Sequence, residues 1–321
     1  VLIVGAGPAG LYLAYLLKRQ DPAVRLRVVE QNPSDATFGF GVVFSDRALE
    51  FLRGDDPQTC ALLSAAMEQW SDLTLAHRGE RIVIDGIGFA AIGRLALLQL
   101  LQQRLASVGI RPEYGRAITD ARELDGHDLV VGADGVNSFV RNAHAAAFGS
   151  RVDVLDNRFA WFGTSKRYET LTQTFVETDA GTFNAHHYRY APGMSTFLVE
   201  CDARTCERAG LAALDEAATI ATCERIFAAT LDGHPLVANR SLWRRFPRIR
   251  NARWSVGSRV LIGDALHTAH FSIGSGTRLA LEDSIALARA LREHPASVAD
   301  ALAAFEATRR PVVDKLVAAA D

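Results

Sequence analysis

The sequence predicts an α/β protein in which an antiparallel β-sheet is inserted into a domain built on a parallel sheet. Glycine-rich turns follow short apolar runs at residues 1–10 and 259–276, and such runs are typical of parallel strands covered on both faces. From about residue 158 the chain changes to β-rich runs separated by turn residues, which is typical of antiparallel sheets. Two Ala- and Leu-rich helical segments then close the chain.

The first segment begins with a βαβ unit. Val1–Val4 is a wholly apolar strand, a helix follows to about Lys18, and Arg25–Glu30 is a second strand. Apolar residues recur at intervals of three and four over 94–108, as in an amphipathic helix. Two further strands are expected, at 110–114 and 128–132.

The β-rich middle predicts four strands, at 158–166, 172–178, 182–190 and 194–201, and then a helix over 215–231. A basic stretch follows, and the chain returns to a buried strand at 259–263. We therefore expect a discontinuous α/β domain of residues 1–150 and 257–321, and a β-rich substrate domain of residues 151–256.

The composition is that of an ordinary globular chain. It has 321 residues, 49% of them hydrophobic, and 35 Lys and Arg against 37 Asp and Glu. This length supports a sizeable core, and the balanced charge gives no general attraction for nucleic acid or an anionic membrane. Glycines interrupt the apolar start, and no basic region precedes it, so it predicts a strand and a helix rather than a signal or membrane segment.

Four cysteines occur, and no pair has the two-residue spacing of a metal knuckle or redox motif: Cys60, Cys201, Cys206 and Cys223. We expect them to be reduced and the protein to be cytoplasmic. No cluster of His, Cys and carboxylate residues has metal-ligand spacing, so no metal site is expected.

Gly5-x-Gly7-x-x-Gly10 stands between a strand and a helix, which is the context that a dinucleotide fingerprint requires. Gly5 permits the tight turn, Gly7 lets a pyrophosphate approach, and the helix N-terminus offers N–H groups to the anion. Glu30, 20 residues beyond Gly10, would accept hydrogen bonds from ribose hydroxyls. A carboxylate there repels a 2′-phosphate, so FAD or NAD is favoured over NADP.

Two more strand ends are marked by glycine. Asp134-Gly135 follows the strand at 128–132, and Gly263-Asp264 ends the strand at 259–263. Gly274-x-Gly276 then precedes another helix, whose N-terminus can face an anion or a polarised ring. Open α/β sheets bind ligands outside the carboxyl ends of their strands, so we expect these turns to converge on one extended cofactor.

These motifs resemble the FAD-dependent aromatic monooxygenases with the para-hydroxybenzoate hydroxylase fold, and the likeness spans essentially the whole chain. It implies a Rossmann-like FAD-binding domain with an inserted antiparallel-sheet substrate domain. It also implies that Asp264 contacts the flavin ribityl chain, that Arg94 lies near the FAD phosphates, and that Asp134 is associated with FAD and nicotinamide access. The implied cofactor residues are Gly5, Gly7, Pro8, Ala9, Gly10, Glu30, Gln31, Arg94, Asp134, Gly135, Gly263, Asp264, Gly274 and Gly276.

The chemistry that the resemblance implies needs bound FAD and no metal. NAD(P)H visits transiently and reduces the flavin, O2 adds to give a C4a-hydroperoxyflavin, and an electron-rich ring attacks its distal oxygen. The expected product is a hydroxylated aromatic ring.

A narrower likeness lies in four stretches, at 37–46, 185–190, 195–200 and 267–276. They are similar to the salicylyl-CoA 5-hydroxylase and 2-aminobenzoyl-CoA monooxygenase group, which implies 5-hydroxylation of an aryl-CoA thioester. Relatives that hydroxylate indole rings in violacein biosynthesis share much of this pattern. Some bifunctional members carry a flavin-reductase domain downstream, and we expect only the hydroxylase half here.

Several alternatives stay open. The substrate could be a free aromatic such as a tryptophan or indole derivative, or the chain could be a non-hydroxylating flavin reductase or a flavin-binding protein without turnover. A flavin-dependent halogenase is disfavoured because the chain lacks a Trp-x-Trp-x-Ile-Pro segment. A homo-oligomer is also left open.

Period-2 alternation places His186, Tyr188 and Tyr190 on one face of a strand. His186 could accept the proton of a ring hydroxyl or amine, or it could be structural. His267, beside Asp264, is a candidate catalytic residue or only orients its loop. The candidate catalytic residues are thus His186, Tyr188 and His267.

The candidate substrate contacts are Tyr190, Arg245, Arg248 and Phe271. Phe271 replaces a proline of the resembled family, four residues after its histidine. Arg245 and Arg248 belong to a basic stretch that either forms a solvated face or domain seam or meets the phosphates of a CoA ester, because guanidinium suits phosphate.

Overall fold

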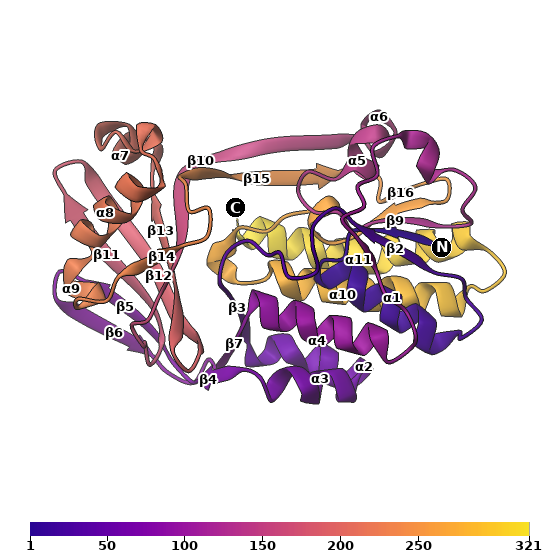
Figure 1. Cartoon of the computed structure of the whole chain (residues 1–321), viewed down its shortest axis with the longest axis horizontal. Coiled ribbons are helices and arrows are strands. Elements are labelled where there is room, and N and C mark those ends of the chain that lie inside the picture. Colours follow the sequence, from indigo (N-terminus) through magenta and orange to yellow (C-terminus); the bar gives the residue numbers. More distant parts are fainter. Residues whose placement is uncertain (321) are drawn as a thin grey trace.

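The structure is a computed structural model that describes residues 1–320, apart from the side chains of residues 46, 47 and 273. A parallel sheet with its helices forms one end of the molecule, and an antiparallel sheet forms the other (Figure 1). The long strands β10 (Ser150–Thr164) and β15 (Arg244–Asn251) run between the two ends at the top of the view.

The parallel sheet has six strands in the order β16-β17-β9-β1-β2-β8, and every pair except β16 with β17 is parallel. In that order the strands are Ser255–Val256, Arg259–Leu261, Val130–Gly132, Leu2–Val4, Arg27–Glu30 and Glu113–Tyr114. β1 lies in the middle because all three of its side chains are apolar and buried. This is the Rossmann-like sheet that the sequence predicts.

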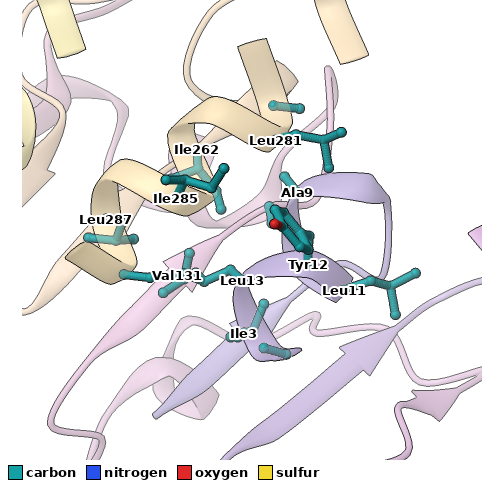
Figure 2. Close-up of a cluster of buried hydrophobic side chains, with 14 of the residues drawn as sticks. Ile3, Ala9, Leu11, Tyr12, Leu13, Val131, Ile262, Leu281, Ile285 and Leu287 are labelled. Atoms are coloured by element: carbon teal, nitrogen blue, oxygen red, sulfur yellow. The ribbon is translucent and has the colours of Figure 1, made fainter. Parts of the chain in front are cut away.

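Eight helices accompany the parallel sheet in the described part of the chain: α1 (Pro8–Gln20), α2 (Glu50–Asp55), α3 (Pro57–Ser64), α4 (Arg94–Ala106), α5 (Phe139–Ala143), α6 (Ala145–Phe148), α10 (Gly276–Glu293) and α11 (Val298–Ala320). The helix α1 packs along α10. Figure 2 shows Leu13 of α1, Val131 of β9 and Ile285 of α10 in the apolar core between them. The strand ends that carry the glycine turns are therefore anchored on the main core.

The antiparallel sheet follows the order β14-β10-β13-β12-β11-β5-β6, with β15 paired to β10. Besides β10 and β15, its strands are β14 (Leu236–Ala238), β13 (Met194–Cys201), β12 (Gly181–Ala191), β11 (Leu171–Thr178), β5 (Leu73–His77) and β6 (Glu80–Ile84). β5 and β6 come from the first segment, and β5 joins β11 in parallel. The sequence does not predict these two strands in this sheet, and the domain bounds of 1–150 with 257–321 and of 151–256 stay a prediction.

A third, three-stranded sheet lies beside β12. It consists of β3 (Gly41–Ser45), β7 (Phe89–Gly93) and β4 (Glu68–Trp70), with β7 in the centre. A Cβ added to Gly41 would come within 2.6 Å of the Tyr190 side chain. Glycine is needed here because the backbone of β3 approaches the ring of Tyr190 closely.

The two faces of the antiparallel sheet differ. One packs against α7 (Ala203–Arg208), α8 (Glu216–Ile226) and α9 (Ala228–Leu231), and the packed side chains form an apolar core. Phe183 and Ala185 of β12 point into this core. Because strand side chains alternate, Asn184 and His186 lie on the opposite face, toward the loop that follows β17.

Three local expectations differ from the structure. The basic stretch is the strand β15, and β10 begins at Ser150 rather than at 158. The helix expected over 215–231 is interrupted at Phe227, which leaves helical geometry and separates α8 from α9. Among the described residues, no helix combines the length and the apolar character that crossing a membrane requires.

Candidate active site

Three loops meet at the carboxyl edge of the parallel sheet. Val4 of β1 and Leu261 of β17 both pair with Gly132 of β9, so the three strands end level. A Cβ on Gly5, whose φ is +103°, would come 2.3 Å from the carbonyl oxygen of Ala133. Only glycine fits such a close approach with a positive φ, which explains how the loops after β1 and β9 lie against each other.

The first loop leads directly into α1. Gly7 caps this helix without a side-chain hydrogen bond, and Pro8 occupies its first turn. Glu30, at the end of β2, accepts hydrogen bonds from the N–H of Ala6 (2.9 Å) and from the N–H of Asn32 (2.8 Å). Its carboxylate thus holds the loop beside the helix N-terminus, where the dipole favours an anion. Gln31 is exposed next to it.

Arg94 and Asp264 face each other across this edge. Arg94 begins α4, its guanidinium lies 5.6 Å from the centre of the Trp161 ring, and its buried Nε has no partner among the described residues. Burial lowers the pKa of Arg94, and the charge of Asp264 opposes that shift. The side chain of Asp264 is exposed, but many protein atoms surround it. The resulting desolvation raises the pKa of Asp264, and the positive charge of Arg94 partly opposes this shift.

The edge has the features that FAD requires. A Cβ on Gly7, Gly135 or Gly276 would meet no atom within 4 Å, so space lies open beside three glycines. The unpartnered Nε of Arg94 supplies a charged donor, and α1 and α10 both begin here without a capping side chain. Open backbone, helix N-termini and a guanidinium suit a diphosphate-linked cofactor.

The face of the antiparallel sheet that looks toward these loops carries a polar cluster. His186 Nε2 lies 3.0 Å from Asn184 Nδ2 and 3.5 Å from Glu200 Oε2. The other oxygen of Glu200 accepts a hydrogen bond from Asn157 Nδ2 (2.8 Å) and lies 3.5 Å from His270 Nε2. His270 precedes the turn η5 (Phe271–Ile273), so the cluster joins the sheet to the loop after β17.

Aromatic rings surround this cluster. The ring of Phe271 lies 5.0 Å from that of Phe159 and 5.9 Å from that of Phe246, and it meets His186 edge-on at 5.8 Å. These rings come from β10, β15, β12 and the η5 turn. They make an apolar wall beside polar groups, the composition typical of small-molecule sites.

Comparisons with known proteins identify the chain. A family model described as FAD binding domain matches residues 109–320, and one described as lycopene cyclase protein matches residues 1–188. A 3-hydroxy-4-methyl-anthranilyl-[aryl-carrier protein] 5-monooxygenase of Streptosporangium sibiricum is 40% identical, over 98% of this chain and 85% of the relative. The chain belongs to the FAD-binding monooxygenase family with the para-hydroxybenzoate hydroxylase fold. The family predicted from the sequence is thereby confirmed.

Two other relatives in the comparison are also named as a hydroxylase or a monooxygenase. A salicyloyl-CoA 5-hydroxylase of a Streptomyces species is 43% identical over 98% of the chain, which spans 63% of that relative's length. A protodeoxyviolaceinate monooxygenase of Chromobacterium violaceum is 34% identical, over 98% of this chain and 84% of the relative.

The solved structures share the fold at lower identity. A tetrameric 2-methyl-3-hydroxypyridine-5-carboxylic acid oxygenase superposes with a TM-score of 0.80 at 19% identity, over 99% of this chain and 89% of the other. PqsL of Pseudomonas aeruginosa, in complex with 2-aminobenzoylacetate, gives a TM-score of 0.77 at 22% identity, over 99% and 94%. The predicted fold class is confirmed.

The structure brings the remaining FAD candidates to the same edge. A Cβ on Gly263 would lie 3.2 Å from that of Ala9, so the third loop packs on α1, and Gly274 has a positive φ of +60°. Asp134 accepts hydrogen bonds from the N–H groups of Phe139 (2.7 Å) and Val140 through one oxygen, while its other oxygen is buried without a partner among the described residues. Asp134 thus shapes its own loop.

His267 and Tyr188 are held by the protein itself. His267 is buried, and its Nε2 lies 2.9 Å from Oδ2 of Asp283, which favours the loop-orienting alternative. The Tyr188 hydroxyl donates a hydrogen bond to the Gly41 carbonyl (3.0 Å), and its ring stacks on Trp70. Burial raises the pKa of Tyr188 far above its usual range. A group so occupied is poorly placed to move a proton, and its direct catalytic role stays a prediction.

The two arginine candidates lie on β15 at the seam between the sheets. Arg245 Nη2 pairs with Asp156 Oδ1 at 2.9 Å, and Arg248 Nη2 lies 3.7 Å from Asp153 Oδ2, both across to β10. This arrangement matches the domain-seam alternative, and a role in phosphate binding stays a prediction.

Sequence reasoning gave no role to Glu200, Asn157, Phe159 or Trp161. Alternation within β13 could have placed Glu200 on the same face as Leu198. The signal that matters, the register that sets Glu200 opposite both Asn184 and Phe159, depends on strand pairing and is not visible in the sequence of one strand.

Proposed function

We propose that this chain hydroxylates an aromatic ring presented as a CoA thioester, with salicylyl-CoA or 2-aminobenzoyl-CoA as the substrate and the 5-position as the target. When bound, FAD reduced by NAD(P)H supplies the activation of O2. The observation that carries the proposal is the cluster of three phenylalanine rings centred on Phe271, which meets His186 edge-on and lies in the loop that leads to α10.

The residues around the expected position of the substrate ring have separate roles. Phe159, Phe246 and Phe271 exclude water and hold a planar substrate. His186 can accept the proton that a ring hydroxyl or amine releases when the ring, acting as the nucleophile, forms its bond to oxygen. The positive guanidinium of Arg94 can bind the negatively charged phosphates or other polarised atoms of the cofactor.

The thioester form rests on the names of relatives. One is named for salicyloyl-CoA and another for an anthranilyl group on an aryl-carrier protein, so both names describe acyl groups on a carrier. The name of the protodeoxyviolaceinate monooxygenase mentions no carrier. This relative supports the second candidate, a free aromatic such as an indole derivative.

The test measures NADH and NADPH consumption by FAD-loaded protein with four compounds in parallel: salicylyl-CoA, 2-aminobenzoyl-CoA, free salicylate and tryptophan. Mass spectrometry then gives the mass of the product. Hydrogen peroxide is also measured, because it forms when NAD(P)H is oxidised without hydroxylation. We expect a thioester to stimulate oxidation and to gain the mass of one oxygen atom. Stimulation by a free aromatic alone would replace the thioester by the second candidate, and bound FAD without stimulation by any aromatic would contradict both.

A further inference from the structure

Glu200 is a buried carboxylate on the face of the antiparallel sheet that looks toward the FAD loops. Its exposed fraction is 9%. It lies opposite Asn184 of β12 and Phe159 of β10 in the sheet register, between the aromatic wall and the polar part of the face. A cavity of about 220 Å³ borders both Glu200 and Asn184, so the carboxylate has room for a ligand at its side.

The surroundings of Glu200 keep it ionised. Burial alone would raise its pKa, but the hydrogen bonds from His186 and Asn157 and the nearby charge of His270 outweigh burial, and the pKa lies below its ordinary value. These groups come from β12, from β10 and from the loop before η5. Near neutral pH Glu200 therefore presents a negative charge to the cavity, with the imidazoles of His186 and His270 beside it at 3.5 Å.

This charge discriminates between ring substituents. A hydroxyl or amino group on a ring can donate a hydrogen bond to an anionic oxygen, and such bonds are stronger than neutral ones. A ring that bears a free carboxylate would place a second negative charge near Glu200, which is repulsive in a desolvated site. A thioester or an amide in place of that carboxylate removes the repulsion.

We propose that Glu200 determines the substrate class: it accepts a hydrogen bond, directly or through His186, from a ring hydroxyl or amino group, and it rejects rings that carry a free carboxylate. This inference rests on the proposed function and narrows it to phenols and anilines whose acyl group is uncharged. It also gives a physical reason why a carrier thioester is the accepted form, independent of any contact with the carrier itself.

The first test is a binding test with three small ligands that share one ring: salicylamide, benzamide and salicylate. Salicylamide has the donor and a neutral acyl group, benzamide lacks the donor, and salicylate carries the charge. Calorimetric titration of the FAD-loaded protein should give a dissociation constant for salicylamide about tenfold or more below those of the other two. Equal binding of all three, or binding of none, overturns the inference.

The second test repeats the titration with Glu200→Gln, which keeps the size of the side chain and one acceptor oxygen and removes the charge. The preference for salicylamide should fall to about threefold or less, and salicylate should gain affinity. Glu177→Gln is the matched control, since Glu177 lies on β11 of the same sheet, separated from β13 by β12, and is exposed and paired with Arg78. This variant should keep the full preference. Glu200→Asp, which retains the charge, should preserve rejection of salicylate even if Glu200→Gln folds poorly.

The two hypotheses can fail separately. If the wild-type protein hydroxylates a thioester while Glu200→Gln keeps the ligand preference, the inference on Glu200 is wrong and the proposed function stands. If the wild-type protein prefers salicylamide but no aromatic stimulates NAD(P)H oxidation, the proposed function is wrong and the recognition by Glu200 stands.

Discussion

The imidazole of His267 and the carboxylate of Asp283 form a buried pair, with 2.9 Å between Nε2 and Oδ2. The same Oδ2 accepts a hydrogen bond from the N–H of Gly263 (3.0 Å), and Arg309 Nε of α11 donates to the other oxygen at 3.1 Å. Asp283 on α10 thus fixes the turn that holds Asp264 at the carboxyl edge of the parallel sheet. His267 acts here as a positioning residue.

Replacing Asp283 by Asn should destabilise the protein. Burial alone would raise the pKa of Asp283, but His267, Arg309 and the Gly263 N–H outweigh it and lower the pKa. Losing the charge leaves the buried Arg309 with Glu282 as its remaining carboxylate partner and removes the charge beside His267, so the free energy of unfolding should fall by about 3 kcal/mol. Urea denaturation near neutral pH measures this, with Asp314→Asn, an exposed carboxylate on α11, as the control.

The same variant has an expected pH signature. A carboxylate whose folded pKa is depressed adds stability above its ordinary pKa of 3.8, and this stability is lost as the pH falls through the folded pKa. The stability difference between wild type and Asp283→Asn should therefore shrink only in strong acid. A difference that is absent at neutral pH would show that the buried pair does not stabilise the turn.

Two glycines of the first loop should respond differently to alanine. A Cβ on Gly7 would meet no protein atom within 4 Å and φ is −74°, whereas a Cβ on Gly10 would come 2.0 Å from the Gly5 carbonyl oxygen. Gly7→Ala should therefore keep the melting temperature of the FAD-free protein and weaken FAD binding about tenfold or more, because the methyl group occupies cofactor space. Gly10→Ala should lower the melting temperature itself.

Thermal unfolding of the apoprotein and fluorescence titration with FAD separate these two effects. A Gly7→Ala protein that binds FAD as tightly as wild type would mean that the cofactor does not approach this loop.

Arg245 and Arg248 allow a direct test of the CoA proposal. If they meet phosphates of the carrier, the double variant with Gln at both positions should raise KM for the CoA ester about tenfold and leave KM for a truncated thioester nearly unchanged. Steady-state kinetics with the two substrates measures this, and Arg292→Gln, exposed on α10, is the control. An equal change for both thioesters would assign the arginines to the seam that their pairs with Asp156 and Asp153 already form.

The sequence predicts the turns at the carboxyl edge of the parallel sheet well, because the constraints on these turns are local. Gly5 and Gly263 are needed for positive φ values of +103° and +59°, and each directly follows a short buried run. A strand, a tight turn and a helix in immediate succession determine the position of the loop. Tertiary packing adds only the level ending of the three strands.

The substrate face depends on tertiary pairing, so less of it could be predicted. The basic composition of Arg244–Asn251 gave no strand signal, and β15 forms because β10 offers an edge for it to pair with. The contact of Glu200 with His270 joins residues 70 positions apart in the chain, on a strand of one sheet and a loop of the other. Period-2 alternation assigns a face to each residue, but it does not tell which residues of neighbouring strands meet.

His187 should make the protein acid-sensitive. It is buried, its ring stacks on Phe197 with centres 5.3 Å apart, and its Nε2 lies 2.9 Å from the hydroxyl of Thr174. Burial, with smaller contributions from the charges of His186 and Arg81, lowers its pKa from 6.5 to about 3. The folded protein thus holds His187 neutral, while the unfolded chain binds a proton below pH 6.5, so stability falls as the pH drops through this window.

His187→Phe keeps the stacked ring and removes the titrating group. Compared with this variant, wild type should lose about 1.4 kcal/mol of unfolding free energy for each pH unit below the ordinary histidine pKa, or about 2 kcal/mol by about pH 5. Urea denaturation at about pH 7 and about pH 5 gives the two differences, and His77→Phe serves as the control because His77 is exposed. Parallel pH dependence of wild type and His187→Phe would mean that His187 is protonated in the folded state, and its stacking on Phe197 would then have to tolerate a charge.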